Sequence, residues 1–309
     1  MTRPAPGLSS RTNGLVRGLG ALALSAALGL GLWLGAGSPA QAKPPIWIVR
    51  SPHATLVLFG SIHLLPAGLD WRPTTLDDAL AKADELWFEL PITVKAGEEA
   101  AAASLARGAL PKDKRLTAML SPDETERLVQ ASITLHCVPE AIDRMQPWMA
   151  ELTLSVAEDA RSGADASDGV EDEIEAEADP AVARRSFETA GQQIAFLAGA
   201  PVKDQIASLN WTVGEIDGDP GSYQRVVDEW MAADLAGLKR DANDPLQRVA
   251  PRLYDRLIVG RNRRWAGQLA ARLRSPGKIV VVVGIGHLIG PDGLPALLRA
   301  RGLDVEGPA

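Results

Sequence analysis

Cysteine and aromatic residues are scarce in this sequence, which has one cysteine, two tyrosines and four phenylalanines among 309 residues. The single cysteine, Cys137, cannot form an internal disulfide, so the fold must depend on its hydrophobic core and on any bound metal. Its apolar surroundings, ITLHCVPEAI, predict a small buried side chain rather than a reactive thiol.

Positive charge is also in short supply, with 32 basic against 39 acidic residues. A net charge of −7 argues against a nucleic-acid partner. A dinucleotide or flavin site is not indicated either, because VVVGIGHLIG lacks the third glycine and the following acidic residue of that fingerprint. No linker divides the chain, and 46% hydrophobic residues are enough for a sizeable core.

Residues 1–42 have the pattern of a secretory signal peptide. Arg3, Arg11 and Arg17 precede the uncharged apolar run 19–34, and the small residues of Ala-Gln-Ala at 40–42 resemble a cleavage site. Cleavage there leaves a mature domain, residues 43–309, with a net charge near −10, because three arginines and no carboxylates are removed. We therefore expect a periplasmic or secreted protein without a stable membrane span. An uncleaved membrane anchor is the alternative.

The first part of the mature chain predicts a compact αβ unit. Residues 46–49 and 55–59 are β-rich runs around RSPHA and predict a hairpin, with His53 as a solvated turn residue. Residues 76–83 have helical spacing, and ELWFEL at 85–90 predicts a strand that Pro91 ends.

The middle of the chain, residues 98–257, predicts mostly helix. Helix signals include the cap SPDE at 121–124 and the amphipathic PWMAELTLSVA. His136 falls between two of these helices and is interpreted as structural or exposed. Residues 165–179 carry eight carboxylates and no basic residue, and their apolar spacing predicts a helix with a solvated acidic face rather than a calcium loop. Further on, FETAGQQ places Glu188 and Gln192 one helical turn apart.

A long helix is expected after Pro251, and it carries two polar residues on its apolar side. Arg261 lies four residues from both Leu257 and Trp265, so its guanidinium needs a carboxylate or a ligand if it is buried. Asn262 is turned partly inward by the same spacing. SPG then ends the helix, and KIVVVV predicts a fully buried strand.

Two segments share one pattern: VLFGSIHLLPAGL at 57–69 and VVVGIGHLIGPDGL at 281–294. In each, a glycine-x-x-histidine unit follows an apolar strand and leads to a Pro-x-Gly-Leu. A glycine at a strand end permits a sharp turn, so His63 and His287 are expected to project over one sheet edge and to converge on a shared cleft. The alternative is that each imidazole only caps its own turn.

A carboxylate is expected beside the histidines, because two imidazoles and one carboxylate form a common set of ligands for a divalent metal. Glu89 is the best candidate, since it ends the ELWFEL strand. The alternative is an edge-strand glutamate that faces water. His63, Glu89 and His287 are therefore the predicted metal ligands.

The paired histidine segments, the ELWFEL glutamate, the GRNRRWA helix and the closing GPDGLPALLRARGLDVE resemble the TraB/PrgY/GumN family, which is related to the Tiki metalloproteases. The resemblance implies an α+β fold like those of erythromycin-esterase-like (EreA) and ChaN-like proteins, in which two pseudo-repeated αβ halves share a central mixed sheet around a largely helical middle segment. It also implies that Arg261 and Asn262 belong to the site, and that manganese or cobalt is the metal. One departure concerns Pro91, which stands where relatives often have an aspartate ligand.

Four functional hypotheses follow. The first is an exported metal-dependent hydrolase, acting on peptides or another small extracytoplasmic substrate, in which Arg261 stabilises the oxyanion or holds a substrate carboxylate and Asn262 orients a neighbouring group. The second is a metal-free variant with the histidines and Glu89 as acid and base. The third is a non-catalytic protein that binds a peptide or glycan, and the fourth an accessory factor for envelope polysaccharide. The oligomeric state stays open.

Overall fold

The computed structural model describes residues 43–66, 68–165, 169–219 and 221–308. The predicted signal peptide, residues 1–42, lies outside these ranges. Within them, no helix combines the length and the apolar character needed to cross a membrane.

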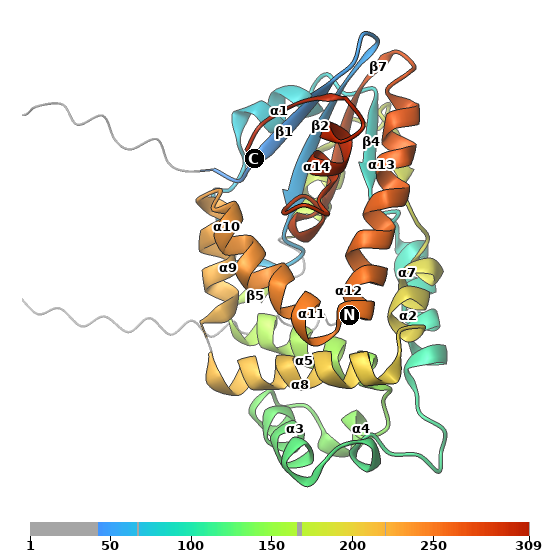
Figure 1. The fold of residues 1–309 in the computed structure, drawn as a ribbon, viewed down its shortest axis with the longest axis vertical. Coiled ribbons are helices and arrows are strands. Elements are labelled where there is room, and N and C mark those ends of the chain that lie inside the picture. The colour runs from blue at the N-terminus through green and yellow to red at the C-terminus, as the bar shows by residue number, and fades with distance from the viewer. Residues whose placement is uncertain (1–42, 67, 166–168, 220, 309) are drawn as a thin grey trace, which may run out of the picture. The chain divides into compact units, whose positions relative to one another are not determined.

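A six-stranded sheet has the spatial order β6-β4-β7-β2-β1-β8, and a two-stranded sheet pairs β3 with β5 (Figure 1). The strands are β1 (Ile46–Arg50), β2 (Ala54–Ser61), β3 (Leu65–Pro66), β4 (Glu85–Phe88), β5 (Ala164–Asp165), β6 (Ala183–Ser186), β7 (Gly277–Gly284) and β8 (Asp304–Glu306). Strands β6, β4, β7 and β2 run parallel to one another, whereas β1 is antiparallel to both β2 and β8. The expected mixed central sheet is confirmed.

Helices fill most of the chain between β4 and β7, and two more lie outside that segment, α1 before β4 and α14 after β7. They are α1 (Thr74–Leu80), α2 (Val94–Gly108), α3 (Pro122–Thr134), α4 (Pro139–Ile142), α5 (Pro147–Arg161), α6 (Val170–Glu177), α7 (Ala190–Ala198), α8 (Val202–Gly218), α9 (Ser222–Met231), α10 (Leu235–Leu238), α11 (Asp244–Val249), α12 (Pro251–Tyr254), α13 (Gly260–Arg272) and α14 (Leu294–Arg299). Short 3-10 helices η1 (Thr117–Met119) and η5 (Ile285–His287) and π-helical segments η3 (Lys239–Asn243) and η4 (Asp255–Val259) complete the chain. The largely helical middle segment is confirmed.

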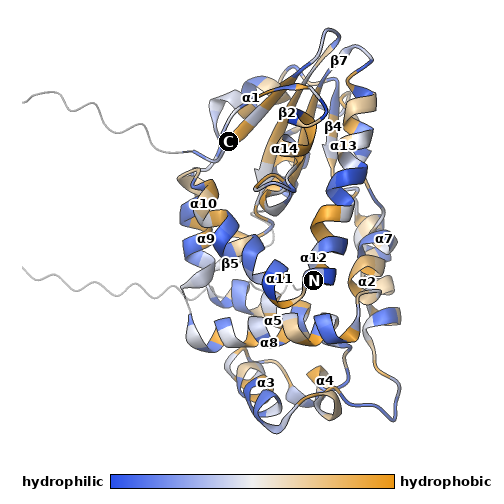
Figure 2. Ribbon diagram, viewed as in Figure 1, coloured by the Kyte–Doolittle hydropathy of each residue, from blue (hydrophilic) through white to orange (hydrophobic). Residues whose placement is uncertain are grey.

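The central strands form the main core. Residues 279–283 of β7 and 56–59 of β2 are almost fully buried, and Figure 2 shows both strands as strongly hydrophobic. Continuous valine and leucine runs of this kind suit a parallel strand that is covered on both faces. A second apolar cluster lies among α3, α5 and α8, where Leu128, Leu154 and Leu209 are buried together. Ser121 and Glu124 form the expected capping box at the start of α3.

The helix expected after Pro251 is continuous from α12 through η4 to α13, with a π-helical turn at Asp255–Val259. Such turns shift the register of the residues that follow and often occur at functional sites. Here the shift comes directly before Arg261. Arg261 and Asn262 are buried as predicted, and Arg263 is exposed.

The two glycine-histidine segments contact each other directly. A Cβ atom added to Gly60 would lie 2.4 Å from Cδ1 and 3.1 Å from Cα of Ile285, so a larger residue there would require Ile285 to move. The repetition does not extend through the sheet in an obvious way, since the strand after the first segment (β4) is parallel to β7, whereas the last strand (β8) is antiparallel to β1. Two equivalent αβ halves, and the likeness to EreA and ChaN folds, therefore stay expectations.

Candidate active site at three neighbouring strand ends

Three neighbouring parallel strands present the candidate residues at one edge of the sheet. Ser61 pairs with Gly284 at the ends of β2 and β7, and Phe88 pairs with Val282 where β4 ends. His63, Glu89 and His287 each follow one of these ends. This edge is where open α/β sheets usually bind ligands.

Gly284 lies at the centre of the group. A Cβ atom built on Gly284 would lie 3.3 Å from Glu89 Oε1, 3.7 Å from His63 Nε2 and 4.0 Å from His287 Cδ2. The backbone N–H of Gly284 also donates to Glu89 Oε1 over 2.8 Å. The predicted convergence of the two histidines and the glutamate is thus observed, and a larger residue at position 284 would crowd all three.

The guanidinium of Arg261 is paired with two carboxylates. Its Nη2 donates to Glu89 Oε2 over 2.5 Å and its Nε donates to Glu188 Oε2 over 2.9 Å. Its Nη1 donates to the carbonyl of Leu257 over 3.1 Å. The Arg261 side chain is only 5% exposed, so these partners supply the pairing that a buried cation requires.

Glu188 was not among the predicted site residues. The FETAGQQ pattern linked it to Gln192, but Gln192 instead caps α7 together with Thr189. Glu188 turns inward and accepts hydrogen bonds from Arg261 and from the indole of Trp265, whose Nε1 lies 3.2 Å from Glu188 Oε1. The unmet charge of Arg261 was the signal that a further buried carboxylate was needed.

Asn262 determines the tautomer of His287. Asn262 Nδ2 donates to the carbonyls of His287 (3.1 Å) and Asp292 (2.7 Å), so its Oδ1 is left to accept from His287 Nδ1 over 2.6 Å. The proton of the neutral imidazole is therefore on Nδ1. His287 Nε2 then has a free lone pair, which accepts from Arg261 Nη1 over 3.0 Å.

Burial and neighbouring charges keep His287 neutral and Glu89 ionised. Burial lowers the pKa of His287 to about 3, so its imidazole stays neutral. Burial alone would raise the pKa of Glu89. Electrostatic interaction with His287, Arg261 and His63 outweighs this effect and lowers the pKa to about 2. Because His287 is neutral, Arg261 is the fixed positive charge that keeps Glu89 ionised.

His63 forms a separate pair with Glu171. His63 Nδ1 lies 2.8 Å from Glu171 Oε1, which also accepts from Ser61 Oγ over 2.6 Å. The charge of Glu171 raises the pKa of His63 to about 10. Because 67% of the His63 side chain is exposed, water screens part of this attraction. The imidazole nonetheless favours its protonated form.

The interpretation of residues 165–179 as a solvated acidic face is wrong for one residue. Glu171 is 8% exposed and is turned toward His63, although its neighbour Asp172 is exposed as expected. The apolar spacing of Val170 and Ile174 correctly predicted α6. It could not reveal that Glu171 lies beside a histidine more than a hundred residues earlier in the chain.

A pocket of about 280 Å³ opens onto this site. It is lined by His63, Phe88, Glu89, Leu90, Ile92, Glu171, Asp172 and Gln193. Arg261 and His287 do not line the pocket and lie behind Glu89 in the network described above. A ligand would therefore meet His63 and Glu89 first.

The donor atoms do not fit a divalent metal in this arrangement. Arg261 donates to His287 Nε2 and to Glu89 Oε2, so the lone pair with which His287 would bind a metal is already engaged. His63 has its Nδ1 against Glu171 and favours the imidazolium form, which has no lone pair for a metal. Among residues 43–308, leaving out the few that the structure does not describe, no three His, Cys, Asp or Glu side chains form a metal-binding group.

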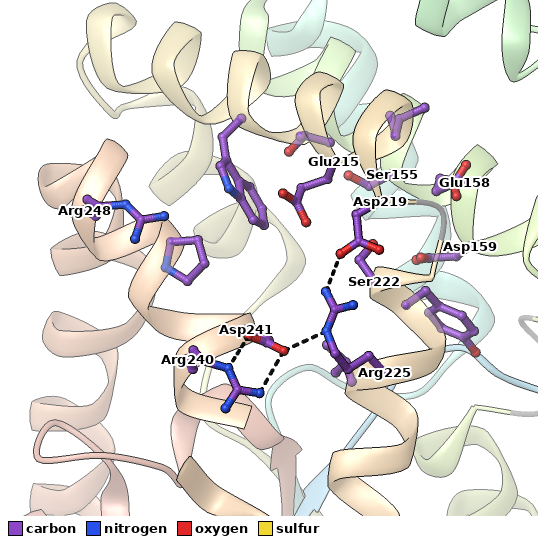
Figure 3. A pocket seen from close by; sticks show the side chains of 16 residues that line it. Ser155, Glu158, Asp159, Glu215, Asp219, Ser222, Arg225, Arg240, Asp241 and Arg248 are labelled. Atoms are coloured by element: carbon purple, nitrogen blue, oxygen red, sulfur yellow. Dashed lines mark hydrogen bonds and ion pairs between the residues drawn. The ribbon is translucent and has the colours of Figure 1, made fainter. Parts of the chain in front are cut away.

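A different cavity, of about 540 Å³, lies among α5, α8, α9 and α11. Arg225 bridges Asp219 and Asp241, and Arg240 bonds to Asp241 as well (Figure 3). These pairs neutralise four of the charged side chains that line the cavity. It lacks the grouping of histidine, carboxylate and buried guanidinium that marks the strand ends.

Comparison with known proteins gives consistent matches over nearly the whole described chain. The sequence model of the TraB/PrgY/gumN family matches residues 45–307. The chain is 26% identical over 260 residues to the uncharacterized protein YbaP of Escherichia coli (strain K12), covering 83% of this chain and 92% of that protein. It is also 26% identical over 246 residues to YbaP of Shigella flexneri, covering 78% and 87%. No solved structure matches significantly.

Proposed function

The chain belongs to the TraB/PrgY/gumN family, and from this premise we propose that it is an exported hydrolase that cleaves peptides or a similar small acyl substrate. The observation that carries the proposal is the meeting of His63 and Glu89 in one pocket, with the guanidinium of Arg261 directly behind them. An acid, a base and a fixed positive charge are the groups that hydrolysis of an acyl bond requires.

His63 is the general acid in this proposal. Its Nδ1 is held by Glu171, so Nε2 faces the centre of the site near Gly284. A histidine oriented by a carboxylate in this way presents one defined nitrogen to the substrate. As an imidazolium, His63 gives its Nε2 proton to the leaving amine when the bond to the acyl carbon breaks.

Glu89 is the general base. It binds a water molecule in the pocket and takes a proton from that water as the oxygen attacks the acyl carbon. A carboxylate with a pKa of about 2 is a weak base while Arg261 is paired with it. Arg261 lies behind Glu89 and does not line the pocket, so it keeps Glu89 ionised from that side, and His63 is the cationic group that faces the substrate. His287 bonds to Arg261, and Asn262 in turn orients His287, so both help to hold the guanidinium against Glu89.

A divalent ion such as manganese or cobalt, which the family resemblance implies, would supply Lewis-acid chemistry if it were bound. The residues as arranged do not fit such an ion, so no step of this mechanism depends on one. The location, periplasmic or secreted, follows from the predicted signal peptide alone. N-terminal sequencing of the exported protein would test it, with Lys43 as the expected first residue.

A second candidate function is the non-catalytic binding of a peptide or glycan. It is favoured by the hydrogen bonds that already occupy both Glu89 oxygens and His287, which leave few reactive atoms free. The same pocket would then hold a ligand without cleaving it.

The test is a peptide library incubated with protein purified without chelator, with cleavage followed by mass spectrometry. We expect wild type to cleave and His63→Ala and Glu89→Gln to lose at least 100-fold in rate. His53→Ala is the matched control, because His53 is exposed and does not line the pocket, and it should retain full activity. Peptide binding without cleavage by any variant would instead support the binding function.

A further inference from the structure

An apolar groove continues from the candidate site. The pocket that contains His63 and Glu89 shares Leu90, Ile92 and Asp172 with a second cavity of about 520 Å³. That cavity extends along the loop after β4 and the first turns of α2. A substrate held at the site therefore has a path into this groove.

The groove is lined mainly by apolar side chains, namely Leu90, Pro91, Ile92, Val94, Ala96 and Ala100. Val94 is 83% exposed, so its apolar side chain faces water at the rim of the groove. Two polar side chains also line it. Thr93 is already engaged, since its Oγ1 accepts the N–H of Ala96 to cap α2, and Asp172 stands at the junction with the site.

Gly97 leaves room within the groove. A Cβ atom added to Gly97 would meet no atom within 4 Å, although Gly97 lines the cavity. Glycine lowers the stability of a helix interior by about 1 kcal/mol relative to alanine. Its place in the fourth helical position after the cap therefore gives space to the groove at some cost to α2.

We propose that this groove binds a bulky apolar side chain of the substrate, next to the bond that faces His63 and Glu89. The occupant follows from two observations: the groove is continuous with the site, and its walls can offer only dispersion and hydrophobic contact along most of their length. Asp172 at the junction disfavours an acidic residue in the same place. This inference rests on the proposed function, because it assigns the substrate of the same pocket.

The experiment compares short fluorescein-labelled peptides that differ only in a central Leu, Phe or Ala, and it measures binding by fluorescence anisotropy and cleavage by mass spectrometry. Two variants alter the groove: Gly97→Leu fills it, and Val94→Asp adds a charge at its rim. Gly267→Leu is the matched control, because Gly267 is also a helical glycine with no atom within 4 Å, on the exposed side of α13. Thermal unfolding checks that all variants are folded.

We expect wild type and Gly267→Leu to bind the Leu and Phe peptides about 10-fold more tightly than the Ala peptide. Gly97→Leu and Val94→Asp should each reduce this ratio to about 2 or less. Apolar preference in binding without cleavage would support the groove and overturn the hydrolase. Cleavage with no apolar preference, or with the same preference in both groove variants, would overturn the groove and leave the hydrolase standing. If none of the peptides binds, the groove proposal also fails.

Discussion

The Oδ1 atom of Asn262 lies 2.6 Å from Nδ1 of His287, and this contact joins the long helix to the end of the central strand. Both side chains are buried, with Asn262 at 0% and His287 at 4% exposure. Because the Asn262 amide donates to two carbonyls, only its oxygen remains for the ring. One asparagine therefore orients His287 and anchors the turn that carries it.

Replacing Asn262 should disturb both roles. Asn262→Ala leaves the ring N–H and two carbonyls without their partners, and a buried unsatisfied group costs about 1–3 kcal/mol. We expect the free energy of unfolding in urea to fall by about 3 kcal/mol. The ¹⁵N shifts of His287 should also change from the Nδ1–H form to a tautomer mixture. An unchanged tautomer would show that other contacts orient the ring.

Removing Glu171 should lower the pKa of His63. The folded pKa, about 10, lies above the ordinary value of 6.5, so this pair stabilises the protein fully below pH 6.5 and its contribution is lost as the pH rises toward 10. Glu171→Gln should bring the His63 pKa, followed by NMR titration, toward 6.5 and flatten the stability in this pH range. Asp172→Gln is the control at the neighbouring position. In this variant the pKa of His63 should stay well above 6.5, because Glu171 is still present.

Removing the guanidinium of Arg261 should destabilise the protein strongly. Arg261→Met leaves Glu89 and Glu188 as buried carboxylates without their principal partner, and breaking a buried pair costs about 3–5 kcal/mol. Arg263→Met, on the exposed side of the same helix, should change stability by less than about 0.5 kcal/mol. Equal effects of the two substitutions in urea unfolding would mean that the buried pairs do not form as described.

The metal hypothesis can be tested by stability as well as by elemental analysis. Because Arg261 bonds to both Glu89 and His287, manganese or cobalt should raise the Tm of the wild-type protein by less than about 1 °C, and a chelator should not lower it. One tightly bound ion per chain, lost together with a large drop in Tm on chelation, would show that Arg261 moves aside and that the predicted ligand set forms.

Glu151, a half-buried carboxylate away from the site, should make the free energy of unfolding fall as the pH rises. Burial raises the pKa of Glu151 to about 7, against hydrogen bonds from Ser208 and Thr212 that lower it. An acid whose folded pKa is raised binds its proton more tightly in the folded state. The loss of stability caused by ionising Glu151 is therefore absent below pH 4.5 and complete above pH 7. It amounts to no more than about 3 kcal/mol. Glu151→Gln should remove this slope from unfolding curves measured between pH 4 and 8, whereas Glu126→Gln, which is exposed, should leave it.

Local patterns were enough to predict several parts of the site. Apolar runs ending in glycine indicated β2 and β7, and a strand stopped by proline indicated Glu89 at the end of β4. The spacing around Arg261 showed that a charged group was buried and needed a carboxylate. His53 and His136 are exposed, as predicted, while Cys137 is half-buried rather than buried.

The sequence by itself determined which residues end the central strands, because strand periodicity and glycine turns are properties of neighbouring residues. Only the tertiary structure decided the partners: Glu188 for Arg261, Glu171 for His63, and Arg261 where a metal was predicted. Carboxylates of the same type are numerous in this acidic chain, and nothing in their local spacing distinguishes a solvated one from one that pairs with a distant charge. That choice depends on how the helices α6 and α13 and the start of α7 pack around the strand ends, which is a long-range property of the fold.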